Sequence, residues 1–413
     1  MKSRPAGQLE QRLLVLVTLG LVAFGLVMVF SATSASAALD AGDPMTFLVK
    51  QSSYALVGLV LLVLASRFDY HRLRVIAPAL LVGAFVLCVA VLVAAPQING
   101  ARRWFLLGPI SVQPSEVAKV AVLVWTCAVL ARRPTPRTMG ELTKPLGLVV
   151  GLFCVLVLLE PDLGTTIALC IMVAGILVVS EVPFRLLAFG GSIALVLGSA
   201  AIYIEPYRRA RFLSFVDPWH DPQGAGFQTV QAIIGIGSGG ITGEGLGGGI
   251  SKIFDLPEAH TDMIFAVVGE ELGLIGCTAV IAAFAVFAWA GFRVALQCRD
   301  PFGKRLAAGI TTLICGQAAI NLCAVLGIAP LTGIPLPFVS YGGSSLIVLL
   351  ASVGVLLNIA VNERIVEARS RDSGRGNSRS HQARARGRGS AARARSERDV
   401  RRQSRPRRVA AGS

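Results

Sequence analysis

Charged and aromatic residues are scarce in this sequence. Of its 413 residues, only 15% are Asp, Glu, Lys or Arg and only 7% are aromatic, whereas 54% are hydrophobic. The mean hydropathy is +0.67. This composition excludes an ordinary soluble domain, in which about 25% of residues are charged, and it indicates a membrane protein.

The sequence also lacks the patterns of a metal or disulfide framework. The four histidines are dispersed, no two of the eight cysteines have CxxC spacing, and seven of the cysteines lie inside apolar runs. We therefore expect neither structural disulfides nor a metal site built from thiolates or histidines.

What the sequence has instead is ten apolar runs that suit helices crossing a hydrocarbon core of about 30 Å. These runs lie near 13–31, 52–66, 75–95, 116–131, 144–159, 164–181, 185–204, 264–290, 305–326 and 343–361. We predict an all-α polytopic membrane protein with about ten transmembrane helices.

The distribution of Lys and Arg in the short loops predicts the orientation, because basic loops stay cytoplasmic. With the N-terminus inside, every cytoplasmic loop is basic and both termini are cytoplasmic. Two loops expected outside are basic as well: one contains Arg102 and Arg103, the other Arg208, Arg209 and Arg211. These arginines suit an anionic ligand; the alternative is pairing with nearby acids or lipid headgroups.

Residues 364–413 differ from the rest of the chain. They contain sixteen arginines and four acidic residues, which gives +12 of the formal net charge of +15. Their Ser, Gly, Ala and Arg composition predicts a disordered cytoplasmic tail after a transmembrane domain of residues 1–363. The tail suits anionic lipid or an acidic partner, or it is merely solvated. Nucleic acid is not expected, because no aromatic residues interleave the arginines.

The connection between the seventh and eighth spans, about 206–261, is the longest external segment. It is too long for a loop that only connects two spans. We expect short amphipathic or re-entrant pieces in it. Nine glycines fall between Gly235 and Gly249. They permit tight turns and close approach of the backbone to a ligand. Turn formation is the simpler explanation, and phosphate binding by backbone amides is the alternative.

Polar residues also mark the predicted start of the fourth span. Ser115 suits a helix N-cap. Glu116 and Lys119 stand three residues apart, so they share a helix face and can neutralise one another. A structural ion pair explains these two residues almost as well as a ligand site does.

Acidic residues crowd at the start of the eighth span. Glu258 and Asp262 precede it, and Glu270 and Glu271 follow about two turns later. Because a carboxylate at a bilayer boundary is costly, such acids predict a functional site. The alternative for Asp262 is a helix cap or first-turn acid that favours the helix dipole. Glu271 points nearly opposite to Asp262, so contacts with another helix explain at least one of the two glutamates.

Several motifs, in order along about residues 12–364, resemble the successive signatures of the SEDS family of bacterial membrane proteins. They are GARRW at 100–104, QPSE at 113–116 with Lys119, EPDLG at 160–164, DPW at 217–219 with GFQ at 226–228, LPEAHTD at 256–262 and PLPFVSYGGSS at 335–345. The forms at 102–104, 217–219 and 227–228 are nearer to the division-type members of the family. The tail has no counterpart in the shared core.

This resemblance implies a glycosyltransferase that polymerises lipid II into peptidoglycan at the external face of the bacterial cytoplasmic membrane, at the division septum. It implies a class B penicillin-binding protein and other division proteins as partners. Asp262 would be the general base of an inverting transfer, with Glu258 as the alternative. A divalent cation, Mg²⁺ or Mn²⁺, has support from the family, although no metal-binding motif is present. The residues expected to bind substrate are Trp104, Arg103, Lys119, Glu116, Arg209, Arg211, Glu258, His260 and Ser340.

Two other functions stay open. A lipid II flippase predicts ionisable residues at the membrane midplane and a path through the bundle. An enzyme predicts a site confined to the external boundary, and the external concentration of charge favours it. A division scaffold would act through its helices and tail, and this function would not require Asp262.

Overall fold

The computed structural model describes residues 8–37, 44–97, 101–108, 110–224, 226–249 and 259–362. The chain divides into a unit Met1–Val361 and a second unit Asn362–Ser413, of which only Asn362 is described. The tail expected from residue 364, and Glu258 in the motif before Asp262, lie outside the described residues.

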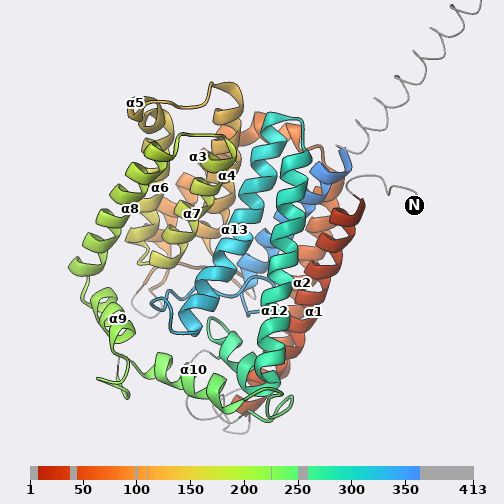
Figure 1. The fold of residues 1–413 in the computed structure, drawn as a ribbon, viewed down its shortest axis with the longest axis vertical. Coiled ribbons are helices and arrows are strands. Elements are labelled where there is room, and N and C mark those ends of the chain that lie inside the picture. The colour runs from red at the N-terminus through yellow and green to blue at the C-terminus, as the bar shows by residue number, and fades with distance from the viewer. Residues whose placement is uncertain are drawn as a thin grey trace, which may run out of the picture. The chain divides into compact units, whose positions relative to one another are not determined.

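The first unit is a bundle of long apolar helices (Figure 1). Within the described ranges, nine helices are long and apolar enough to cross a membrane, and α7 is a shorter apolar helix. The predicted all-α polytopic fold of about ten spans is confirmed. The helices are α1 (Gln8–Ala37), α2 (Pro44–Arg67), α3 (His71–Ala94), α4 (Pro114–Arg132), α6 (Leu148–Leu159), α7 (Leu163–Val179), α8 (Phe184–Ile204), α12 (Ile264–Gln297), α13 (Pro301–Val325) and a last helix, Gly343–Asn362. Helix α6 is the last part of a longer candidate span, Met139–Leu159.

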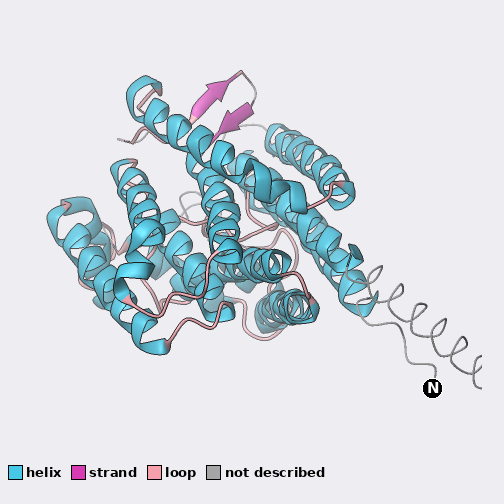
Figure 2. Cartoon of the chain, turned by 90° about the horizontal axis from the view of Figure 1, so that it is seen from above, coloured by secondary structure: helices cyan, strands magenta, loops and turns pink. Residues whose placement is uncertain are grey.

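Shorter elements lie in the connections. Strands β1 (Phe105–Leu107) and β2 (Ile110–Val112) form an antiparallel hairpin before α4, an addition to the all-α prediction (Figure 2). The long connection after α8, where the sequence predicted short amphipathic or re-entrant pieces, contains the short helices α9 (Pro206–Val216) and α10 (Phe227–Ser238). A turn of α-helix, α5 (Met139–Leu142), and a π-helical turn, η1 (Thr143–Gly147), lead into α6.

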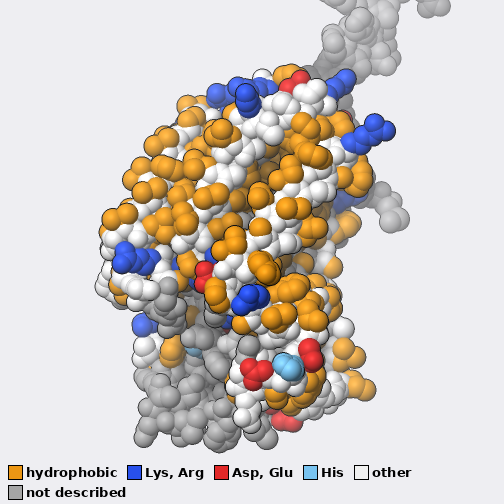
Figure 3. Space-filling model, turned by 90° about the vertical axis from the view of Figure 1, so that its left-hand side faces the viewer, with side chains coloured by type: hydrophobic (Ala, Val, Ile, Leu, Met, Phe, Trp, Pro, Cys, Tyr) orange, Lys and Arg blue, Asp and Glu red, His pale blue; other side chains and the backbone are white. Residues whose placement is uncertain are grey.

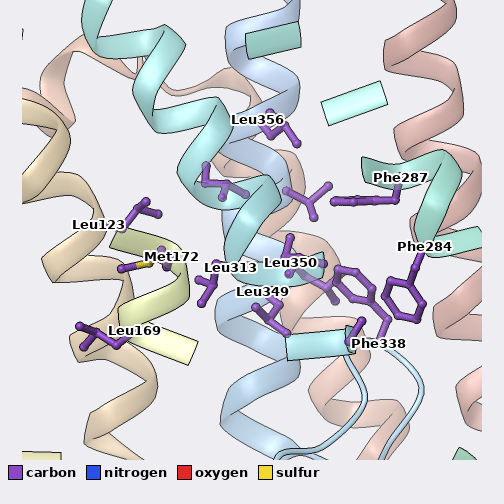
Figure 4. Close-up of a cluster of buried hydrophobic side chains, with 14 of the residues drawn as sticks. Leu123, Leu169, Met172, Phe284, Phe287, Leu313, Phe338, Leu349, Leu350 and Leu356 are labelled. Carbon is purple, nitrogen blue, oxygen red and sulfur yellow. The ribbon is translucent and has the colours of Figure 1, made fainter. Parts of the chain in front are cut away.

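Figure 4 shows a part of the apolar core that lies among α4, α7, α12, α13, the last helix and the loop before it. Small residues let these helices approach closely: a β-carbon on Gly175 would overlap the side chain of Thr312, and one on Gly309 would overlap Leu123. Such packing drives helix association in lipid, where burying apolar surface gives little advantage. The labelled core residues are Leu123, Leu169, Met172, Phe284, Phe287, Leu313, Phe338, Leu349, Leu350 and Leu356.

The outer surface suits lipid. The most apolar stretch of α8 has no buried residue. Hydrophobic side chains cover the middle of the face in Figure 3, and Lys and Arg side chains gather along its upper edge. An apolar band with charges at its margin is the pattern of a membrane-spanning bundle.

Helix α12 is interrupted, although the sequence predicted one continuous span from residue 264. Gly273 has φ 60° and ψ −157°, far from helical values. We call residues 264–272 the first segment of α12. Every residue of this segment from Ile264 to Glu271 is buried.

Candidate active site

Asp262 lies in the turn directly before α12 and is partly buried. The N-cap of α12 is Met263, whose side chain makes no capping hydrogen bond, so Asp262 is not the N-cap residue. The hydroxyl of Thr261 donates to Asp262 Oδ1 at 3.2 Å. The amide of Asn321 on α13 donates to the Asp262 carbonyl oxygen at 2.7 Å and to the Ile334 carbonyl oxygen at 2.8 Å.

Arg211 of α9 comes close to Asp262. A β-carbon on Gly333 would lie 4.0 Å from Arg211 Nη1 and 4.0 Å from Asp262 Oδ2, so these two atoms are at most twice that distance apart. Three segments therefore meet here: α9, the turn before α12 and the loop after α13. Arg209, two residues earlier on α9, is exposed, whereas Arg211 is partly buried.

A second polar group surrounds the start of α4. Lys119 Nζ lies 2.8 Å from Glu116 Oε1, and both side chains are almost fully buried. Among the described residues, neither Glu116 Oε2 nor the Ser115 hydroxyl has a hydrogen-bond partner. The expectation that Ser115 caps α4 is wrong: Gln113 is the N-cap, because Pro114 has the fixed φ and missing N–H that suit the first helical position.

Arg103 and Trp104 lie just before the β-hairpin, and both are partly buried. Arg103 Nε donates to the Glu160 carbonyl oxygen at 2.7 Å, and its Nη2 donates to the Pro161 carbonyl oxygen at 2.5 Å. Arg103 therefore ties the hairpin to the end of α6 through backbone carbonyls.

The two acids after α6 have opposite surroundings. Asp162 caps α7: it accepts hydrogen bonds from the Thr165 amide at 2.8 Å, the Thr165 hydroxyl at 2.7 Å and Gln113 Nε2 at 3.0 Å. Glu160 is fully buried, and within the described residues neither of its carboxyl oxygens makes a hydrogen bond of regular geometry. Burial raises the pKa of Glu160 to about 8, and the charge of Asp162 adds to the shift. The Cys88 thiol, the charge of Arg103 and the Ser115 hydroxyl oppose it.

The motif at 160–164 carries part of the family resemblance, but the sequence predicted no role for Glu160. The available signal was an acid at the boundary of an apolar run. Glu160 directly follows such a run, and Asp262 precedes one.

His260 and Ser340 support the turn around Asp262. The His260 ring packs edge-on against Phe47 of α2 at 4.9 Å and against Tyr341 at 5.4 Å between centroids. The Ser340 hydroxyl is buried and accepts a hydrogen bond from the Leu336 amide at 2.8 Å. Both residues thus make contacts within the protein that hold the loop before the last helix.

The loop after α13 connects the two polar groups. A β-carbon on Gly164, at the start of α7, would lie 2.7 Å from the Thr332 carbonyl oxygen and 2.6 Å from Ile334 Cγ1. The next residue, Gly333, faces Asp262 and Arg211. Both groups therefore belong to one polar region at the end of the bundle where α4, α7 and α12 begin.

Metal ligands do not cluster within the ranges that the structure describes: no three His, Cys, Asp or Glu side chains gather there. Asp262 offers one carboxylate beside Arg211. The described residues around Asp262 would therefore hold a divalent cation only together with other ligands, such as the phosphate oxygens that Mg²⁺ often binds in proteins.

The fold and this polar region define a polytopic helical membrane protein with charged groups collected at one end of its bundle. The family model described as "Cell cycle protein", for FtsW, RodA and SpoVE, matches residues 11–365. The chain therefore belongs to this family, which is the SEDS family, and the resemblance seen in the motifs is confirmed.

Named relatives share most of the chain. The probable peptidoglycan glycosyltransferase FtsW of Geobacter sp. (strain M18) is 39% identical over 349 residues, which cover 83% of this chain and 95% of the relative. Stage V sporulation protein E of Bacillus subtilis (strain 168) is 39% identical over 358 residues, which cover 84% of this chain and 96% of the relative.

Solved structures share the fold. A chain from a peptidoglycan synthase complex that coordinates polymerization and crosslinking superposes with TM-score 0.71 at 32% identity, covering 85% of this chain and 97% of that one. The Rod shape determining protein RodA of Thermus thermophilus superposes with TM-score 0.63 at 29% identity, covering 85% of this chain and 96% of that one.

Proposed function

We infer that this chain is a peptidoglycan glycosyltransferase of the FtsW type, which polymerises lipid II at the external face of the cytoplasmic membrane. Family membership and the names of its relatives support the reaction class. The observation that carries the mechanism is the approach of Asp262 Oδ2 and Arg211 Nη1 around Gly333. This arrangement offers one carboxylate and one cation, the two charges that the transfer needs.

In the proposed inverting transfer, the Asp262 carboxylate takes the proton of the acceptor sugar hydroxyl as that oxygen attacks the anomeric carbon of the donor. The bond from that carbon to the pyrophosphate oxygen breaks, and its electron pair leaves with the polyprenyl pyrophosphate. Arg211 stabilises the negative charge that develops on the leaving group. If a divalent cation takes part, phosphate oxygens of the substrate would hold it, and it would supply further positive charge for the leaving group.

The positions of the buried charges favour an enzyme over a flippase. The buried charged side chains on candidate spans in the described part of the chain all lie near helix starts, and none is at mid-span, where a transport path would need them. They are Glu10, Glu116, Lys119, Glu270 and Glu271.

The proposed partner is a class B penicillin-binding protein that crosslinks the strands made by this chain, at the division septum. The structural match to a chain of a synthase complex that coordinates polymerization and crosslinking supports it. The kinship with FtsW supports the septal placement.

The test is polymerisation of labelled lipid II by the purified protein with its cognate penicillin-binding partner. Asp262→Asn should lower the rate by about 100-fold or more, the usual contribution of a general base. Glu205→Gln, which changes an exposed acid at the start of the same connection, outside the family motifs, is the matched control and should keep the parental rate. An undiminished polymerisation rate for Asp262→Asn would show that Asp262 is not the general base.

A further inference from the structure

The glycine-rich part of the connection after α8 closes onto the break in α12. We call residues Gly239–Gly249 the glycine segment; it directly follows α10. Four backbone hydrogen bonds join it to α12 on both sides of Gly273. They run from Glu244 N to Glu270 O at 3.0 Å, Gly245 N to Glu271 O at 3.0 Å, Leu274 N to Gly240 O at 3.0 Å and Ile275 N to Ile241 O at 3.2 Å.

These bonds involve the groups that a helix break exposes. When Gly273 leaves the helical conformation, carbonyls just before it and amides just after it lose helical partners. Buried backbone groups need such partners. The glycine segment supplies donors to the carbonyls at 270 and 271 and acceptors to the amides at 274 and 275.

Only glycine permits this contact at several positions. A β-carbon on Gly239 would overlap the Gly269 carbonyl oxygen, and one on Gly243 would overlap the Glu271 carbonyl oxygen. Gly243 has φ +78°, and Gly273 has φ +60°. The close backbone approach at these glycines is therefore made to α12, whereas the sequence predicted an approach to a ligand.

The first segment of α12 is held from two further sides. Ser31 of α1 donates its hydroxyl hydrogen to the Glu271 carboxylate, with its oxygen 2.7 and 2.8 Å from the two carboxylate oxygens. Ile236 of α10 packs against Gly269, where a β-carbon would lie 2.8 Å from Ile236 Cγ1. Asp262 stands two residues before this segment, so its position depends on how the segment is anchored.

We propose that the glycine segment is a positioning element of the active site: its backbone hydrogen bonds fix the first segment of α12 and thereby the Asp262 carboxylate. This rests on the role of Asp262 in the proposed function. Gly239 and Gly243 act as positioning residues, because a side chain at either one separates the two backbones.

Matched Gly→Ala variants test the proposal. Gly239→Ala and Gly243→Ala should each lower the kcat of polymerisation at least about tenfold and change the KM for lipid II less than about twofold. Gly237→Ala is the control, because a β-carbon there meets nothing within 4 Å; it should keep the parental kcat. Hydrogen exchange at Leu274 and Ile275 should speed up in the first two variants and not in the control.

A cross-link separates positioning from general loss of structure. Ile241→Cys with Ile275→Cys joins two exposed positions whose backbones are hydrogen-bonded. Its disulfide should restore most of the kcat in Gly243→Ala. Parental kcat in Gly239→Ala and Gly243→Ala despite faster exchange overturns the proposal, as does restored exchange protection without restored kcat. Failure of the Asp262 assignment would appear separately, as full activity in Asp262→Asn.

Discussion

Asn321 is the side chain that holds the backbone at Asp262. One amide group bridges the carbonyl oxygens of Asp262 and Ile334, and the side chain is 2% exposed. The loss of this amide leaves two carbonyls without their donor, which costs about 1–3 kcal/mol of stability for a buried group, and it frees the turn that aims the carboxylate.

We therefore expect Asn321→Ala to lower the polymerisation rate about tenfold or more. Gln317→Ala is the control, because Gln317 is an equally buried amide one turn earlier on α13. Rates measured at saturating lipid II should separate the two variants. Equal rates in both would show that the bridge does not matter for catalysis.

Glu160 should make stability depend on pH. Its ordinary pKa is 4.5 and its pKa in the folded protein is about 8, so the folded state holds an extra proton between these values. The stability from this group is fully present below pH 4.5 and is lost as the pH rises through about 8.

The measurement is Tm between pH 6 and 9. Glu160→Gln cannot ionise, so its Tm should rise relative to the parent as the pH increases across this range. Glu141→Gln, at an exposed position, should follow the parent. A parallel course for all three proteins contradicts the prediction.

At the scale of single elements, the ion pair in α4 can be separated from a ligand site. Lys119→Met leaves Glu116 charged and buried, which should cost about 3–5 kcal/mol. The double variant Glu116→Gln with Lys119→Met removes both charges and should regain most of that stability. If the pair is structural, polymerisation returns with stability. If it binds substrate, the double variant is stable and inactive; thermal unfolding and lipid II turnover distinguish the two.

The spans were predictable because each one needs a long apolar run, whatever its neighbours are. The break in α12 was not, because Gly273 leaves the helix only where residues 240–245 supply backbone partners. The β-hairpin is too short to give a pattern. The approach of Arg211 and Asp262 requires three segments to meet, and no local signal encodes such a meeting. The role of Asn321 was missed for the same reason.

At the scale of the whole molecule, the arginine-rich residues after 364 should be dispensable for chemistry. Residues 365–413 contain fifteen arginines and four acidic residues, a charge of +11, and all but the first of them lie outside the family match, which ends at residue 365. Deletion after Arg364 should therefore leave lipid II polymerisation by the purified protein within about twofold of the parent, since no expected site residue is removed. Polymerisation assays test this, and binding of both proteins to anionic vesicles reports whether the tail contacts lipid. A complete loss of polymerisation would contradict a separate tail.

The length of α12 indicates where the lipid ends. As one straight helix, its 34 residues would reach about 51 Å, well beyond a hydrocarbon core of about 30 Å. Residues 274–297 alone would reach about 36 Å, enough to cross. The break therefore falls near the bilayer margin, and Glu270 and Glu271 lie above it, among protein rather than acyl chains. At this depth the protein can bury two carboxylates without exposing them to the hydrocarbon core.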